Sequence, residues 1–226
     1  MSKILIVPDV HGRTFWHKAI EIIDNVDKVI FLGDYLDPYP HEKITFENAI
    51  IEFGSIMAFK KDYPDKVILL LGNHDMHYLI KEFMNCSRLN NEKRNELNQI
   101  YNEHIDYFNL IYQYNQYLFS HSGIYLDWLE KYKITLEELF DFKKFLKEKW
   151  KTLEDISSIR GGLDFVGSCI WADIRESINR KLIPNIQQIV GHTMLNKPYI
   201  NPSISCLDAQ RCFILNTETG EINEVC

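Results

Sequence analysis

The stretch Val67–Asp75, VILLLGNHD, decides how the rest of the chain is interpreted. Its first five residues are branched and apolar, which is typical of a strand buried on both faces. The strand ends directly in Gly72-Asn73-His74-Asp75, so an amide, an imidazole and a carboxylate follow it without an intervening turn. Because ligands of open α/β sheets bind outside the carboxyl ends of the strands, this junction predicts a functional site.

Four other predicted strands end in the same way, with side chains that can bind a metal. The junctions are Asp9-Val10-His11-Gly12 after Ile4–Pro8, Gly33-Asp34-Tyr35-Leu36-Asp37 after Val29–Leu32, His121 after Tyr117–Ser120, and Gly191-His192-Thr193 after Gln188–Val190. Taken alone, one such residue is ambiguous, because Asp9 could equally cap a helix that begins near Thr14. Five strand ends together indicate groups that converge. Hard oxygen atoms mixed with imidazoles, without a thiolate, suit manganese, iron or zinc better than calcium or a structural zinc.

The remaining pattern alternates short apolar runs with longer amphipathic stretches, which favours an α/β fold. Two further strands are predicted at Ile204–Leu207 and Phe213–Leu215, and helices at Phe15–Ile23, Phe46–Lys60, Lys93–Tyr114 and Thr135–Trp150, the last opening with a capping box. The length of 226 residues predicts one domain over residues 1–226. Its polar, asparagine-rich part at about 76–116 is predicted to be a helical excursion on the surface.

Composition excludes disordered, collagen-like and low-complexity proteins. With 46% hydrophobic and 25% charged residues the chain should fold, and its net charge of −7 argues against an extended nucleic-acid surface. No run approaches about 18 apolar residues, and the N-terminus enters a strand directly, so we expect no membrane segment and a cytoplasmic protein. The cysteines are odd in number and form no Cys-x-x-Cys pair, which predicts free thiols. They are Cys86, Cys169, Cys206, Cys212 and Cys226.

The ordered blocks resemble the calcineurin-like metallophosphoesterase superfamily. Its members carry Asp-x-His, Gly-Asp-x-x-Asp, Gly-Asn-His-Asp or -Glu, a solitary His and Gly-His, and all five stand here in that order over residues 9–193. Many members continue the last block as Gly-His-x-His, but this chain has Met194 there, so it is most similar to the phosphoprotein phosphatase branch with its small bacterial and phage members. The resemblance implies an α/β fold with a two-sheet β-sandwich flanked by helices.

The resemblance also implies roles for the matched residues. It implies two divalent or trivalent metal ions per chain, manganese first and iron or zinc as alternatives. Asp9 and His11 would hold one ion, and Asp34 would bridge the two ions. The second ion would also be held by Asn73, His121 and His192. A metal-bridging hydroxide would attack phosphorus, so no protein nucleophile is needed. His74 would protonate the leaving oxygen and Asp37 would orient it.

Phosphate binding departs from the family pattern. Ser/Thr phosphatases continue the second block as Asp-Arg-Gly, whereas Asp37 is followed by Pro38. Substitute guanidinium groups could come from Arg13, Arg160 or Arg175, each of which could also be an ordinary surface arginine. Four histidines away from the strand ends are interpreted as structural or surface residues: His17, His41, His77 and His104.

The expected function is a dinuclear metal-dependent phosphatase acting on phosphate monoesters of a small molecule, nucleotide or phosphoprotein. One alternative is a phosphodiesterase, which usually accompanies the Gly-His-x-His form, and another is a symmetrical dinucleoside polyphosphate hydrolase. A non-catalytic scaffold is a further alternative, although such proteins usually lose metal ligands and all six matched positions are intact here.

Overall fold

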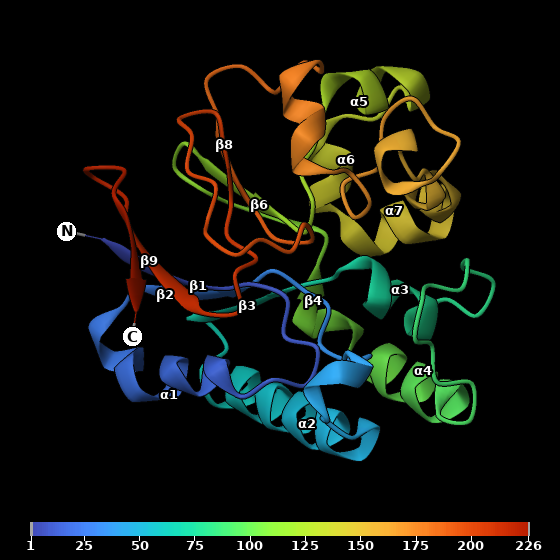
Figure 1. The fold of residues 1–226 in the computed structure, drawn as a ribbon, viewed down its shortest axis with the longest axis vertical. Coiled ribbons are helices and arrows are strands. Elements are labelled where there is room, and N and C mark those ends of the chain that lie inside the picture. Colours follow the sequence, from blue (N-terminus) through green and yellow to red (C-terminus); the bar gives the residue numbers. More distant parts are fainter. Residues whose placement is uncertain (1, 226) are drawn as a thin grey trace. The chain divides into compact units, whose positions relative to one another are not determined.

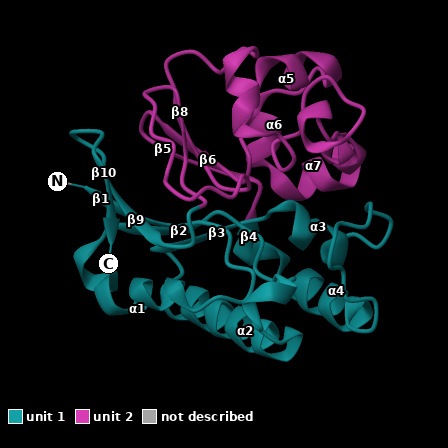
Figure 2. Cartoon of the chain, in the orientation of Figure 1, with its two compact units in different colours: residues 1–108, 209–226 teal, residues 109–208 magenta. Residues whose placement is uncertain are grey.

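The structure, a computed structural model, describes residues 2–225, which form two compact units (Figure 2). Unit 1 contains the residues up to 108 and those from 209 onward, and unit 2 contains residues 109–208. Unit 1 is therefore built from both ends of the chain. The single domain over residues 1–226 stays a prediction.

Unit 1 is built on a six-stranded mixed sheet with the order β10-β9-β1-β2-β3-β4. The strands are β1 (Lys3–Val7), β2 (Lys28–Phe31), β3 (Val67–Leu70), β4 (Phe108–Asn109), β9 (Cys212–Asn216) and β10 (Ile222–Val225). β1, β2 and β3 are parallel, while β9 pairs antiparallel with both β1 and β10. Because β1, β2 and β3 are parallel, their carboxyl ends present three loops at one edge of the sheet. The three strands are almost wholly buried.

The helices of unit 1 lie around this sheet, and α1 and α2 run along one of its faces (Figure 1). They are α1 (Lys18–Ile22, between 3-10 turns at Phe15–His17 and Ile23–Asn25), α2 (Phe46–Asp62), α3 (Asn73–Leu79) and α4 (Arg94–Glu103), with further 3-10 turns at Pro40–Glu42 and Ile105–Tyr107. α2 begins where the Thr45 hydroxyl accepts a hydrogen bond from the Asn48 amide, and Lys60 and Lys61 lie in its last turn.

The segment at 76–116 differs from its prediction. The expected helix over Lys93–Tyr114 is wrong beyond Glu103, because the chain there makes a 3-10 turn and then forms β4 and β5. Aromatic and branched residues suited to strands fill this part, and Phe108, Leu110 and Ile111 are buried. α4 also buries Leu97 and Tyr101, so the segment contributes to the core as well as to the surface.

Unit 2 contains a four-stranded sheet with the order β5-β6-β7-β8. Its elements are β5 (Ile111–Tyr114), β6 (Tyr117–Ser120), β7 (Gln187–Val190), β8 (Ile204–Cys206), α5 (Leu126–Tyr132), α6 (Leu136–Phe140) and α7 (Phe142–Lys149), with 3-10 turns at Trp150–Glu154, Ser158–Arg160 and Ile174–Ile178. β6, β7 and β8 are parallel, and β5 is antiparallel to β6. The helix expected over Thr135–Trp150 is divided at Asp141, whose carboxylate accepts a hydrogen bond from the Lys144 amide and caps α7.

The chain thus has the expected α/β fold, with two mixed sheets flanked by helices. The ends of the predicted strands agree with the observed strands within one or two residues. Four of the cysteines are buried free thiols, and Cys226 lies outside the described residues. Within residues 2–225, no helix combines the length and the apolar character needed to cross a membrane.

Candidate active site

The loops after β1 and β2 are held together by their own backbone. The His11 amide donates to the Asp34 carbonyl at 2.7 Å, and the Gly12 amide donates to the Tyr35 carbonyl at 2.9 Å. His11 and Asp34 both have positive φ, 45° and 53°, a conformation that non-glycine residues adopt rarely and mostly where structure over-determines it. Such strain at two adjacent strand ends is typical of a functional site.

Only glycine fits at position 33, which brings the ends of β2 and β3 together. Gly33 has a φ of 108°, and a Cβ atom there would lie 2.4 Å from the amide nitrogen of Gly72. Asp75 fastens the same junction, because its carboxylate accepts from the amides of Asp34 and Gly72 at 2.7 and 2.8 Å. It also accepts from the Tyr101 hydroxyl at 2.7 Å. Burial raises the pKa of Asp75 to about 7, against these hydrogen bonds. Asp75 therefore positions the loops that carry the predicted ligands.

Unit 1 contributes a buried donor set that fits a cation. Carboxylate oxygens of Asp9 and Asp34 lie within 4.8 Å of each other, and the His11 Nε2 lies 3.5 Å from Asp34 Oδ2. All three residues are at most 3% exposed. Burial, and next the charge of Asp9, raise the pKa of Asp34 well above its ordinary value. A metal ion would offset the repulsion of these carboxylates. His11 Nδ1 donates to the Leu36 carbonyl at 2.7 Å, and this hydrogen bond orients Nε2 for coordination.

Asn73, the fourth predicted ligand of unit 1, opens α3. Its amide nitrogen lies 3.6 Å from the Sγ of Cys86, and that thiol donates to the Asn73 carbonyl at 3.2 Å. Both residues are buried. Because the thiol engages the nitrogen end of the amide, the side-chain oxygen is the atom suited to bind a metal.

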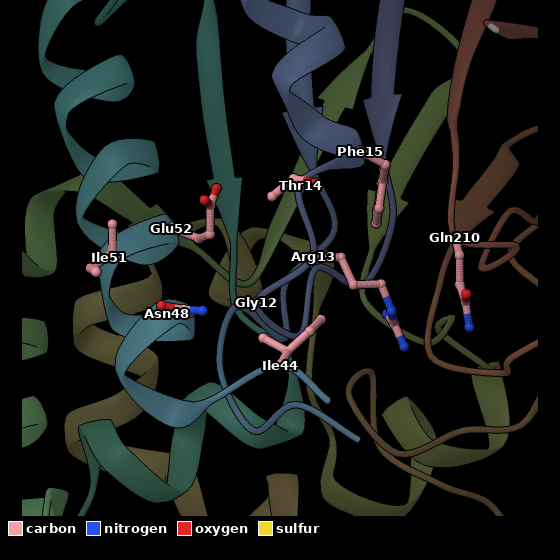
Figure 3. A pocket seen from close by; sticks show the side chains of 9 residues that line it. All are labelled: Gly12, Arg13, Thr14, Phe15, Ile44, Asn48, Ile51, Glu52 and Gln210. Atoms are coloured by element: carbon pink, nitrogen blue, oxygen red, sulfur yellow. The ribbon is translucent and has the colours of Figure 1, made fainter. Parts of the chain in front are cut away.

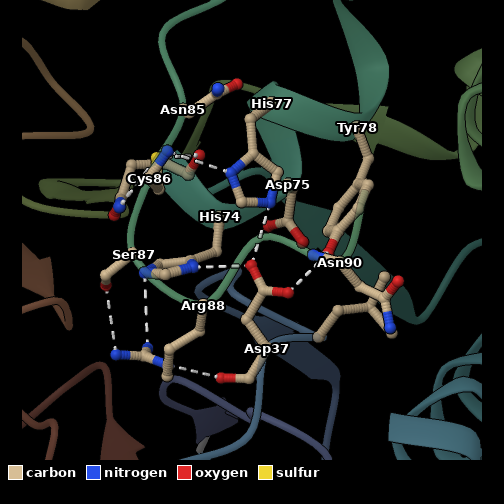
Figure 4. Close-up of polar contacts among 12 residues, drawn as sticks. Asp37, His74, Asp75, His77, Tyr78, Asn85, Cys86, Ser87, Arg88 and Asn90 are labelled. Atoms are coloured by element: carbon tan, nitrogen blue, oxygen red, sulfur yellow. Dashed lines mark hydrogen bonds and ion pairs between the residues drawn. The ribbon is translucent and has the colours of Figure 1, made fainter. Parts of the chain in front are cut away.

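Asp37 is the centre of a second buried cluster in unit 1 (Figure 4). Its Oδ2 lies 2.7 Å from His74 Nδ1 and 2.9 Å from His77 Nε2, and its Oδ1 accepts from the Tyr78 hydroxyl at 2.5 Å. Burial opposes ionisation of Asp37, but the hydrogen bonds of the two imidazoles lower its pKa overall. Burial lowers the pKa of His74 to about 4, although Asp37 opposes this. Without a ligand His74 is therefore neutral at neutral pH, and its Nδ1–H donates to Asp37 Oδ2.

Arg88, which no motif of the sequence predicts as a site residue, completes this cluster. Its Nε donates to the Asp37 carbonyl at 2.8 Å, and its Nη2 lies 3.3 Å from His74 Nε2. The guanidinium carbon lies 3.8 Å from the centre of the Tyr39 ring. Arg88 stands in no motif, 14 residues after His74 in a polar stretch, so the one available signal was that Pro38 occupies the position of the usual arginine.

The three predicted phosphate-binding arginines are each paired with a carboxylate. Arg13 places Nε and Nη2 both 2.9 Å from Glu42 Oε1. In unit 2, Arg160 and Arg175 both bind Asp173, at 3.2 Å and 2.7 Å. Contact of these arginines with substrate stays a prediction.

A hollow of about 590 Å³ adjoins the loop after β1 (Figure 3). Residues 12–15 line it together with Ile44, Ile51, Glu52 and Gln210, among others. The mixture of apolar and hydrogen-bonding side chains suits an organic group better than a bare ion.

Unit 2 contributes the two remaining predicted ligands, one from each of two adjacent strand ends. His121 Nε2 and His192 Nδ1 are 3.0 Å apart, and both residues are buried. The Gly191 amide donates to the His121 carbonyl at 2.8 Å, which fixes the spacing. His192 has a φ of 65°, again a rare conformation for a residue with a side chain. Two buried imidazoles at this separation are a donor pair that a metal can use.

Comparison with known proteins agrees with this chemistry. A family model described as calcineurin-like phosphoesterase matches residues 2–194. The structure is similar to a cold-active protein-tyrosine phosphatase of a psychrophilic Shewanella species, with a TM-score of 0.65 and 17% identity over 100% of this chain and 81% of that chain. It is also similar to a protein serine/threonine phosphatase from Saccharomyces cerevisiae, with a TM-score of 0.60 and 14% identity over 100% and 80% of the two chains.

At these identities the two structures establish the fold alone, and no curated protein matches the chain in sequence. The family model spans most of the chain and includes all five of the strand-end blocks, which confirms the predicted resemblance. The chain therefore belongs to the calcineurin-like phosphoesterase family and is a metal-dependent phosphoester hydrolase.

Proposed function

We propose that this protein is a phosphatase for phosphate monoesters that works with two metal ions. The ligands would be Asp9, His11, Asp34 and Asn73 of unit 1 with His121 and His192 of unit 2. The observation that carries the proposal is the buried Asp37–His74 pair, because a histidine oriented by a carboxylate is a proton donor for a leaving group. Metal ions bound by such ligands supply positive charge that offsets the phosphoryl oxygens and lowers the pKa of water.

The residues around His74 support its role as the general acid. In the reaction, a water oxygen bonds to phosphorus, the bond between phosphorus and the leaving oxygen breaks, and the leaving oxygen takes a proton from His74 Nε2. His74 is neutral in the free protein, but the negative charge of a bound phosphate raises the pKa of a nearby imidazole. Asp37 Oδ2 then stabilises the imidazolium through the 2.7 Å hydrogen bond at Nδ1. The hollow beside the β1 loop offers room for the organic part of the ester.

A panel of esters tests the proposal. The metal-loaded protein would be given 4-nitrophenyl phosphate, bis(4-nitrophenyl) phosphate, diadenosine tetraphosphate and a phosphopeptide, with manganese. We expect the monoesters to be hydrolysed faster than the diester. Faster cleavage of the diester or of the dinucleotide would replace the monoesterase by one of those activities. No turnover of any ester by protein that carries its metals would contradict the proposal.

A further inference from the structure

Arg88 is held in an unusual conformation beside the catalytic histidine. It lies in the segment between α3 and α4 and has a φ of 66°, which is costly for a residue with a long side chain. From there the side chain reaches back to the loop after β2, where the Asp37 carbonyl accepts from Nε and the Tyr39 ring lies under the guanidinium. A carbonyl bond and an aromatic face fix the plane of the group, so its two terminal nitrogens are oriented before any ligand binds.

The charge of Arg88 is not neutralised by a carboxylate. Within residues 2–225, its polar contacts are to the Asp37 carbonyl, the Ser87 hydroxyl at 3.3 Å and His74 Nε2. Arg13, by contrast, places two nitrogens on Glu42. A half-buried guanidinium without a counter-charge is poised to bind an anion. Nη2 points at the imidazole nitrogen from which the proton would leave (Figure 4).

We infer that Arg88 binds a non-bridging oxygen of the phosphoryl group and so takes the place of the arginine that Pro38 replaces. The inference rests on the proposed function and adds the residue that recognises the phosphate. In the free protein Nη2 donates to the lone pair of His74 Nε2. A phosphate oxygen that accepts from Nη2 would replace this contact with His74.

Calorimetric titration with inorganic phosphate tests this inference without turnover. The metal-loaded wild type would be compared with Arg88→Ala, Arg88→Lys and Arg211→Ala. Arg211 is a matched control, since it is an arginine of unit 1 paired with Glu224 at the surface. A lost charge-assisted hydrogen bond predicts about 10- to 100-fold weaker phosphate binding in Arg88→Ala, a smaller loss in Arg88→Lys and no change in Arg211→Ala.

Three results would overturn the inference. The first is phosphate affinity in Arg88→Ala within about twofold of wild type. The second is absence of phosphate binding by the metal-loaded wild type. The third is equal phosphate affinity in Arg88→Ala and Arg211→Ala. If kcat falls while the affinity stays unchanged, Arg88 is a positioning residue for Asp37. Metal content and unfolding temperature of each variant exclude a folding defect. The titration needs no substrate, so it can be interpreted separately from the proposed function. A protein that binds phosphate through Arg88 but hydrolyses no ester would contradict the proposed function and support this inference.

Discussion

Asp37 in unit 1 and Asp173 in unit 2 are both fully buried carboxylates with several donors, yet their partners differ in kind. Asp37 is bound by two imidazoles and a tyrosine hydroxyl. Asp173 is bound by two guanidinium groups, and its own amide donates to Glu176 at 2.7 Å in a capping box. Two partners of Asp37 are imidazoles, a group that can take up and release a proton, whereas the guanidinium partners of Asp173 stay protonated.

The two carboxylates differ in whether a cation beside them is already neutralised. At Asp173, cations meet the buried charge directly, and the side chain also caps the turn at Ile174–Ile178 through the Arg175 amide. At Asp37, the nearby guanidinium of Arg88 binds the backbone carbonyl, so its charge stays available beside His74. Burial and hydrogen-bond number are similar at both sites. The titratable partner and the uncompensated cation mark the cluster that we expect to do chemistry.

Replacing the acid should have the largest effect. For His74→Asn we expect kcat for 4-nitrophenyl phosphate to fall about 100- to 10,000-fold, the range of general acid–base catalysis, with metal content unchanged. His104→Asn, which alters an exposed histidine of unit 1, is the matched control. Stopped activity assays on both variants check this. Wild-type turnover by His74→Asn would show that the Asp37 cluster is as structural as the Asp173 cluster.

Removing the metals should lower stability as well as activity. Asp9 and Asp34 repel each other when both are ionised, so a cation that binds only the folded state stabilises it. At a metal concentration about 100-fold above the dissociation constant, the unfolding temperature should rise by about 5–10 °C. Differential scanning calorimetry with and without chelator measures the rise, which should shrink by more than half in Asp34→Asn. An equal rise in the variant would contradict the ligand role of Asp34.

His77 was interpreted as structural, and its position on Asp37 makes it a positioning residue. His77→Phe keeps a ring but removes a polar neighbour of Asp37 Oδ2, so the carboxylate should be held less firmly in the orientation in which it binds His74. We expect kcat to fall about tenfold and the free energy of unfolding to fall by about 1–3 kcal/mol. Urea unfolding and the pH profile of kcat are the measurements. Loss of stability with an unchanged profile would leave His77 a purely structural residue.

The smallest effect concerns pH and Asp173. Burial opposes its ionisation, but hydrogen bonds from Arg175 and the charge of Arg160 lower its pKa overall. A folded pKa below the unfolded value of about 3.9 contributes stability that is present above pH 4 and is lost as pH falls through the folded value. Asp173→Asn, which keeps a capping side chain, should therefore cost about 1 kcal/mol at pH 7 and less at pH 3. A constant cost at both values would mean that the ion pairs contribute nothing.

The sequence predicted the parts of the molecule where one local signal dominates. Continuous apolar runs such as Val67–Leu71 locate the parallel strands, and the polar residues that follow each strand locate the loops of the candidate site. The helix predicted over Lys93–Tyr114 failed because polar side chains there hide a short buried strand. α3 was missed because its residues, Asn73–Leu79, were interpreted only as a motif and a polar tail.

Long-range partners lay beyond prediction for a physical reason. Nothing in the sequence around Arg88 says that its side chain returns to Asp37, since the two are 51 residues apart and meet only through the fold. The same holds for the pairing of Arg160 and Arg175 with one carboxylate, and for the donation from Tyr101 to Asp75. Sequence spacing identifies which groups gather at a strand end. Tertiary packing decides which of them are paired within the protein and which remain available to bind a ligand.

The most direct test of the account is a metal titration of the stripped protein, with bound metal and monoester hydrolysis followed in the same samples. We predict that hydrolysis rises with bound manganese until two ions are held per chain, and that His74→Asn binds the same two ions with little hydrolysis. Full activity in the stripped protein, or saturation with metal that brings no hydrolysis of any phosphate ester, would contradict the account.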